Sequence, residues 1–379
     1  MLRNLFGNRR TMVVLVPAIL IVCGIVGWME RTSLEAWFYL RGLARADEAS
    51  QALWVKRVAT LDSAALPGLI DLLAQDDPRA CANSEAALTA LSEHWNADDP
   101  RRAALARQLI EGLPRFSEPG QRGAFHVSAG WLSASGGNSP AAAETEVVIA
   151  RLLEEAARVA GSEGRAAALE LADRFLGEAA DPARLRPCRE LVQACLQDAD
   201  QETRLRAARL GLRPGMAMEK SLVALLNDSA PEVRRLVLPA LGNAKEAIET
   251  EDLLRWLHDS DAEVRRECEI ALRRGRGLSS PEIQLGRLIT DSSARIRLQV
   301  LKQFGKRTDS RVYPSVWLRH MSHDSAPEVR FAAIRAIKEM GISELSDRVD
   351  QMARNDPSPT VCEYARRFLD SHVKTAHTP

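Results

Sequence analysis

The chain has 379 residues and equal numbers of basic and acidic side chains, 51 Lys and Arg against 51 Asp and Glu. A molecule without net charge at pH 7 is not drawn as a whole to nucleic acid, which excludes a strongly basic nucleic-acid-binding protein. Aromatic residues make up only 5% of the chain, whereas Ala, Leu and Arg are frequent, so packed helices are favoured over sheets.

The chain begins with a short flank, residues 1–10, and residues 11–29 follow without a single charged side chain. A helix of that length, at about 1.5 Å per residue, spans roughly the 30 Å hydrocarbon core of a bilayer. We therefore expect residues 11–29 to form one transmembrane helix that anchors the chain in a lipid bilayer. Two other interpretations are a cleaved signal peptide and a buried helix. The apolar run is long for a signal peptide, and no small-x-small cleavage site follows it.

The orientation of this expected anchor is predicted from the basic residues on its two sides. The short N-terminal flank and the longer C-terminal flank carry similar numbers of arginines, namely Arg3, Arg9 and Arg10 against Arg31, Arg41 and Arg45. The higher density of positive charge on the N-terminal side favours an N-terminus inside the cell. We expect the rest of the chain to lie at an extracytoplasmic face of the membrane.

Residues 30–60 are predicted to form a juxtamembrane helical segment. Several aromatic residues lie near the expected membrane surface: Trp28, Trp37, Phe38 and Tyr39. Amphipathic rings prefer the headgroup level of a bilayer, which would anchor the segment there. The alternative is that Trp37 and Phe38 pack on the first helical hairpin, and the sequence does not decide between the two.

Residues 61–196 are predicted to form degenerate helical repeats. Near their start, the apolar residues 66–73 lead into Asp76-Asp77-Pro78 and a second apolar-periodic stretch. Residues 114–140 are rich in Gly, Ser and Pro. They could form a flexible break between two segments, or loops around a short helix at 124–133; we expect the loops.

Residues 197–370 contain clear repeats, each marked by an aspartate at steps of roughly thirty residues. The repeated aspartates are Asp198, Asp228, Asp259, Asp291, Asp324 and Asp356. Five residues after each lies a small or β-branched residue: Thr203, Val233, Val264, Ile296, Val329 or Val361. The next position is Arg204, Arg234, Arg265, Arg297, Arg330 and, as the exception, Cys362. Apolar residues at helical spacing on both sides of each aspartate predict two helices and a short link per unit. A polar tail, residues 371–379, follows.

A hairpin of two short helices cannot bury its own apolar faces, so neighbouring hairpins must stack into one continuous core. The pattern Leu-Leu-x-Asp-x-x-Pro-x-Val-Arg at residues 225–234 resembles the short, PBS-lyase-like HEAT repeats. This resemblance implies an all-α fold, a right-handed α-solenoid of stacked helical hairpins that serves as a binding scaffold.

Motifs for catalysis are missing from the sequence: it has no phosphate-binding glycine loop, no nucleophile elbow and no HExxH. Among HEAT-like proteins, iron hydroxylases use repeated His-Glu pairs, and this chain has no His-Glu dipeptide. His258, His320 and His323 beside the repeated aspartates could hold a metal. However, the aspartates are already explained as link residues, so we expect no catalytic residue, no metal and no cofactor.

The arginine column has two interpretations. Stacked arginines could bind phosphates, as in HEAT-like DNA glycosylases, or they could pair with the repeated aspartates in an alternating ladder of charge. We expect the ladder, because each arginine lies near acidic residues of its own or the adjacent link.

The cysteines are expected to be free thiols. Cys188 and Cys195 lie about 10.5 Å apart along a continuous helix, beyond the roughly 7 Å limit for a disulfide. Cys268 falls in an apolar column of the repeats and is expected to be buried and inert.

The sequence therefore predicts a membrane-anchored HEAT-repeat scaffold that binds another protein through one of its faces and is not an enzyme. The expected partners are an unidentified protein and the lipid bilayer, without nucleic acid. The alternative is a HEAT-like enzyme, either a metal-dependent hydroxylase or a DNA glycosylase, or a solenoid that binds anions or nucleic acid.

Overall fold

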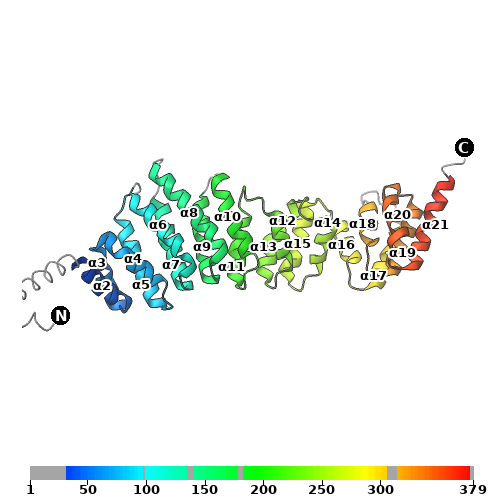
Figure 1. Cartoon of the computed structure of the whole chain (residues 1–379). Coiled ribbons are helices and arrows are strands. Elements are labelled where there is room, and N and C mark those ends of the chain that lie inside the picture. The colour runs from blue at the N-terminus through cyan, green and yellow to red at the C-terminus, as the bar shows by residue number, and fades with distance from the viewer. Residues whose placement is uncertain (1–30, 97–98, 135–139, 178–181, 305–313, 376–379) are drawn as a thin grey trace, which may run out of the picture. The chain divides into compact units, whose positions relative to one another are not determined.

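The computed structural model describes residues 31–96, 99–134, 140–177, 182–304 and 314–375 (Figure 1). Within these ranges the regular elements are all helices, which confirms the predicted all-α class. The chain divides into two compact units, Met1–Ala217 and Met218–Pro379. The predicted transmembrane segment 11–29 lies outside the described residues. None of the helices in the described ranges has the length and apolar character needed to cross a membrane.

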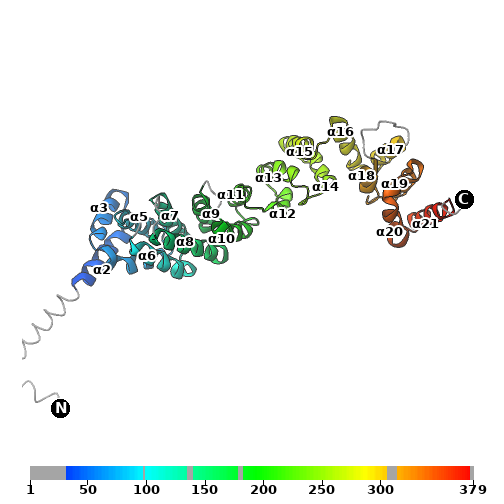
Figure 2. The same cartoon turned by 90° about the horizontal axis from the view of Figure 1, so that it is seen from above.

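The first unit consists of helical hairpins stacked in two layers. Its helices are α2 (Arg31–Ala44), α3 (Glu48–Ala59), α4 (Leu66–Leu73), α5 (Pro78–Glu93), α6 (Pro100–Gly112), α7 (Glu118–Ala134), α8 (Pro140–Val159), α9 (Ser162–Leu176), α10 (Pro182–Cys195) and α11 (Gln201–Gly211). Helices α3, α5, α7, α9 and α11 pack on one another in sequence, and α6, α8 and α10 form the second layer (Figure 2), to which α4 belongs through its contact with α6. The core between the layers is filled by fully buried leucines such as Leu69, Leu88 and Leu109.

Aspartates start several helices of this unit. Asp47, Asp77, Asp99 and Asp200 each accept a hydrogen bond from a free N–H group in the first turn of the following helix. Pro78 and Pro100 occupy the first helical positions, where the missing N–H would have no partner in any case. These local signals fix where each hairpin turns.

The helix expected at 124–133 within the loop region 114–140 is present but longer than predicted, because residues Glu118–Ala134 form the continuous helix α7. One glycine of this stretch, Gly120, is required by close packing. A Cβ atom placed on Gly120 would lie 1.9 Å from the carbonyl oxygen of Leu73, at the end of α4. The same carbonyl accepts a hydrogen bond from the Ser117 amide at 3.2 Å. A glycine therefore lets the start of α7 approach α4 within hydrogen-bonding distance.

The second unit contains the clear repeats. Its helices are α12 (Glu219–Leu222), α13 (Pro231–Asn243), α14 (Thr250–Leu253), α15 (Ala262–Gly275), α16 (Ser280–Ile289), α17 (Ala294–Phe304), α18 (Pro314–Met321), α19 (Pro327–Met340), α20 (Ser346–Asn355) and α21 (Pro359–Thr375). The short helices α12 and α14 continue as 3₁₀ turns, Val223–Asn227 and Leu254–His258.

Within the second unit, the second helix of each repeat packs on the second helix of its neighbour, with one exception. Helix α13 packs on α15, α17 on α19, and α19 on α21. Helices α15 and α17 have no comparable contact, and α16 touches both of them. Within each unit the stacked hairpins are consistent with an α-solenoid.

We expect Gly120→Ala to lower the free energy of unfolding, by about 1–3 kcal/mol or more. The new methyl group would collide with a backbone carbonyl, which cannot move aside as a flexible side chain can. Urea denaturation of the full chain measures the change.

Gly130→Ala is the matched control on the same helix, because a Cβ atom there meets nothing within 4 Å. Removing a glycine from an exposed helical position should stabilise the protein by up to about 1 kcal/mol. Similar effects of the two substitutions would show that α7 does not approach α4 as described.

Candidate functional site

The repeated aspartates shape the links between the two helices of each repeat. In all six, the carboxylate Oδ1 accepts a hydrogen bond from the backbone N–H two residues further on, at 2.8–3.0 Å. The donors are the amides of Asp200, Ala230, Asp261, Ser293, Ala326 and Ser358. The bond holds the chain in a tight turn just before the second helix begins. Each repeated aspartate therefore stabilises the turn in the link of its own repeat.

The arginines of the next column lie in the first turns of the second helices and reach back to the link. In each, Nη1 donates to the backbone carbonyl of the aspartate in the same repeat, at 2.6–2.8 Å. The arginines are Arg204, Arg234, Arg265, Arg297 and Arg330. Cys362 occupies this position in the last repeat, and its thiol lies 3.2 Å from the Asp356 carbonyl oxygen. The sulfur thus makes a weaker version of the same contact.

Arg234, Arg297 and Arg330 also bind the aspartate of the following repeat, each through two parallel hydrogen bonds. Arg234 pairs with Asp259 at 2.7 and 2.8 Å. Arg297 pairs with Asp324 at 2.6 and 2.8 Å, and Arg330 with Asp356 at 2.8 and 2.9 Å. We call this series the Arg–Asp ladder.

The ladder is buried: the Arg330 side chain is 9% exposed and the Asp356 side chain 3%. The other two pairs are nearly as enclosed. Arg234, Arg297 and Arg330 are therefore enclosed by aspartates of their own chain and do not form an open basic strip for phosphates.

Electrostatics in the ladder favour the charged forms of both partners. Burial is the largest single influence on the Asp259 carboxyl and raises its pKa. The hydrogen bonds from Arg234 and the Asp261 amide, together with the nearby charges of Arg234 and Arg265, outweigh burial, so the pKa lies below the ordinary value. The same balance lowers the pKa of Asp356, with Arg330 as the partner. The carboxylate hydrogen bond in turn raises the pKa of each arginine.

The ladder differs at Asp291 and at Asp198. Arg265 and Asp291, both within the described residues, are not joined by an ion pair in the structure, and this gap coincides with the loose contact between α15 and α17. In the first unit, Asp198 is held by Ser162 Oγ at 2.7 Å and Arg165 Nη1 at 3.1 Å, both from α9. Asp198 is therefore also paired with an arginine, although this arginine does not belong to the repeated arginine column.

The apolar column of the repeats mostly faces the core. Thr203, Val233, Val264 and Val329 are fully buried, and Val361 is 1% exposed. Ile296 differs, because it is only partly buried. It lies in the first turn of α17, beside the gap in the ladder.

The histidines near the links do not gather into a metal centre. His258 Nε2 lies 3.0 Å from both the Arg287 carbonyl oxygen and Thr290 Oγ1. Burial lowers the pKa of His320, and also that of the more exposed His323. In the part of the chain that the structure describes, no group of three His, Cys, Asp and Glu side chains could hold a metal ion.

The described cysteines are free thiols and most are buried. Burial raises the pKa of Cys188, Cys195 and Cys268 to about 12. These thiols stay protonated at neutral pH and are poor nucleophiles and poor metal ligands. Cys188 and Cys195 lie on the continuous helix α10, as the sequence predicted.

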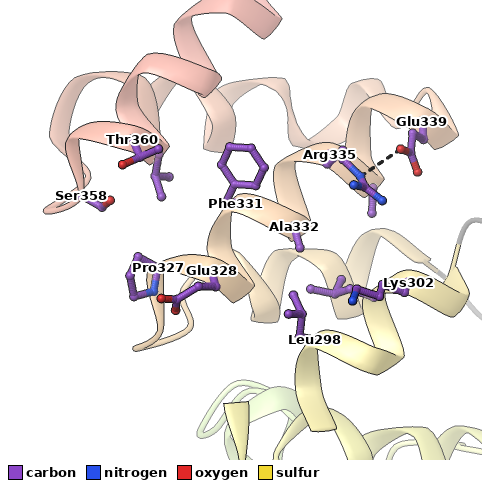
Figure 3. A pocket seen from close by; sticks show the side chains of 13 residues that line it. Leu298, Lys302, Pro327, Glu328, Phe331, Ala332, Arg335, Glu339, Ser358 and Thr360 are labelled. Atoms are coloured by element: carbon purple, nitrogen blue, oxygen red, sulfur yellow. Dashed lines mark ion pairs between the residues drawn. The ribbon is translucent and has the colours of Figure 1, made fainter. Parts of the chain in front are cut away.

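A hollow on the surface of the second helices is the feature that the sequence did not indicate. It has a volume of about 450 Å³ and lies among α17, α19 and α21. Figure 3 shows Phe331 and Ala332 at its middle, and Leu298 and Val361 add apolar lining. The centroids of the Phe331 and Tyr364 rings lie 4.3 Å apart. We call this the Phe331 hollow.

Charged side chains of both signs surround the Phe331 hollow. Lys302 and Glu328 lie at its edge, and Arg335 pairs with Glu339 at 3.1 Å (Figure 3). An apolar centre with a charged rim is typical of a surface that binds another protein. The only signal in the sequence is an aromatic residue two positions after the core Val329, on the outward side of the helix.

We expect Arg330→Met to lower the free energy of unfolding by about 3–5 kcal/mol, because it leaves the buried Asp356 carboxylate without its charged partner. Urea denaturation of the full chain measures the loss. Arg335→Met, on the same helix, is the matched control. Both side chains of its pair with Glu339 are 54% exposed, so its loss should cost at most about 1 kcal/mol. Equal losses would contradict a structural role for the ladder.

Known proteins resemble this chain in part. No curated protein matches the sequence. One similar solved structure is an engineered protein from the Northeast Structural Genomics Consortium, 14% identical. That match covers 89% of this chain and 98% of the other, with a TM-score of 0.23, which carries no argument about fold or function. Residues 188–273 match the family model described as HEAT repeats. This match, together with the stacked helical hairpins, supports a HEAT-repeat family for the chain.

Proposed function

We propose that this chain is a membrane-anchored HEAT-repeat scaffold that binds another protein and has no catalysis of its own. HEAT repeats are commonly protein-interaction scaffolds, and the family match covers residues 188–273, at the start of the clear repeats. The observation that carries the proposal is the contrast between the ladder and the Phe331 hollow. The repeated charged side chains hold the repeats together internally, whereas the open surface of the second helices presents an apolar hollow with a charged rim.

The proposed occupant of the Phe331 hollow is an apolar side chain of a partner protein, flanked in the partner by charged residues. The apolar lining favours an apolar side chain, because filling the hollow removes both surfaces from water. The rim offers Lys302 and Arg335 as well as Glu328 and Glu339, so flanking charges of either sign find a complement.

The membrane anchor in this proposal is residues 11–29, whose structure lies outside the described residues. Their length and lack of charge support a helix that crosses the bilayer once. The density of arginines before them supports an N-terminus inside the cell and repeats at an extracytoplasmic face.

We expect the full chain, with a C-terminal tag, to stay in the membrane fraction after extraction with alkaline carbonate. The double substitution Leu20→Arg/Ile21→Arg should release it, because each arginine at the centre of a membrane helix costs about 2.5–3.5 kcal/mol on insertion scales. Leu20→Val/Ile21→Val is the matched control and should behave as the wild type. Release of the wild type by carbonate would refute the anchor.

Protease added to cells with an opened outer envelope reports the orientation of the same tagged chain. Digestion of the repeats, with a cytosolic control protein intact, is the expected result. Protection until lysis would reverse the orientation.

A photo-crosslinking residue in place of Thr360, an exposed residue on the rim, should form an adduct of defined mass with one partner protein in cells. The same residue in place of the exposed Arg354, on α20 and outside the hollow, should not. Adding Ala332→Arg, which places a long charged side chain at the middle of the hollow, should abolish the Thr360 adduct without changing the melting curve. Adducts of equal yield at both positions would contradict binding at the hollow.

A further inference from the structure

The first hairpin carries an unusual share of exposed apolar surface. Seven large hydrophobic side chains are well exposed among the described residues, and four of them belong to α2 and α3. These are Leu34, Trp37, Phe38 and Leu53, which are 52–60% exposed. Scattered single apolar residues are ordinary on a protein surface, but a cluster with two aromatic rings on one hairpin indicates an interaction surface.

The exposed cluster is not a part of the core that failed to pack. The opposite face of α2 is buried, with Leu43 fully enclosed and Ala36 8% exposed. Leu40 lies against Gly68 at the start of α4, where a Cβ atom would come within 2.2 Å of its side chain. Helix α2 therefore packs on the rest of the unit through one side and leaves its aromatic side open.

The rings of the cluster are arranged with cations beside them. Phe38 meets Trp54 of α3 edge-on, with ring centroids 6.0 Å apart. The Arg41 guanidinium lies 5.3 Å from the centre of the Trp37 ring, and that of Arg57 lies 4.8 Å from the Trp54 ring. We call the surface formed by Leu34, Trp37, Phe38, Leu53 and Trp54 the aromatic surface.

Exposed basic side chains on the same hairpin favour a partner whose surface is negatively charged. Arg41 lies on α2, Arg45 directly follows it, and Lys56 and Arg57 lie on α3. The hairpin also carries the acidic residues Glu35, Asp47 and Glu48, of which Asp47 caps the start of α3 through Ser50. Aromatic rings with flanking Lys and Arg are typical of the membrane–water interface, where the rings lie at headgroup level and the cations meet lipid phosphates.

The position of the first hairpin in the sequence, next to the expected membrane anchor, also favours contact with a lipid bilayer. Only Glu30 separates the uncharged residues 11–29 from Arg31, the first residue of α2. Trp37 lies six residues into the helix, about 9 Å along its axis at 1.5 Å per residue. A ring that close to the end of a membrane-spanning helix is within reach of the headgroup layer, which is several ångströms thick on each side of the bilayer.

We propose that the aromatic surface lies in the headgroup layer of the bilayer and so fixes the first hairpin against the membrane. This inference rests on the proposed membrane anchor and adds a second contact with lipid. One spanning helix alone would leave the repeats free to rotate about its axis, whereas a second contact removes that freedom.

The test uses the full chain reconstituted in vesicles of phosphatidylcholine and phosphatidylglycerol, with p-benzoylphenylalanine in place of Trp37 or, separately, Leu53. We expect covalent lipid adducts at both positions after irradiation. The same residue in place of Val147, an equally exposed apolar position on α8, is the matched control and should give no lipid adduct above background.

The other outcomes separate this inference from the proposed anchor. If the chain stays in the vesicles after carbonate extraction but positions 37 and 53 give no lipid adduct, the inference is overturned and the anchor stands. Adducts between two copies of the chain at these positions would assign the surface to self-association and overturn it as well. Extraction of the chain from the vesicles by carbonate would overturn the anchor and this inference together.

Discussion

The buried pairing of an arginine in one repeat with an aspartate in the next is the interaction on which the clear repeats depend. The same two residues stabilise the link within each repeat and the contact between neighbouring repeats. The aspartate closes the link of its own repeat by accepting an amide two residues on, and the arginine binds the carbonyl of its own link. The pair between Arg234 and Asp259 then connects neighbouring hairpins. Because both charges are enclosed, removal of either would leave the other buried and unpaired.

The ladder also explains why the most conspicuous charged residues of the sequence are poor candidates for a binding site. Arg234, Arg297 and Arg330 have their donors occupied by carboxylates and backbone carbonyls. The two surfaces proposed for partners, the Phe331 hollow and the aromatic surface of the first hairpin, do not include these arginines and aspartates. A HEAT-like stack can therefore keep one structural motif constant while its outward residues vary with the partner.

At the position where the ladder is interrupted, the neighbouring repeats also make fewer contacts with each other. Arg265 keeps its bond to the Asp259 carbonyl, yet no ion pair joins it to Asp291 within the described residues. Helices α15 and α17 also lack the close contact seen between the other neighbouring second helices, and Ile296 is partly exposed there. Fewer buried contacts between these two helices lower the cost of local opening at this position.

The sequence by itself determined the helical class, the period of the repeats and the local chemistry of the links. These features depend on short-range patterns: apolar residues at helical spacing, a proline or an aspartate before a helix, an arginine at a fixed offset. It missed that the helix expected at 124–133 begins at residue 118, because Gly120 permits the close approach of α7 to α4, and that contact depends on a residue more than forty positions away.

Only the tertiary structure decided which arginines reach the next aspartate and where the ladder is broken, because both depend on how neighbouring hairpins pack. It also decided that Phe331 lines an open hollow and that Trp37 and Phe38 stay exposed while Leu43 is buried. Exposure is set by the neighbours that cover a residue, and for these residues the neighbours come from other helices.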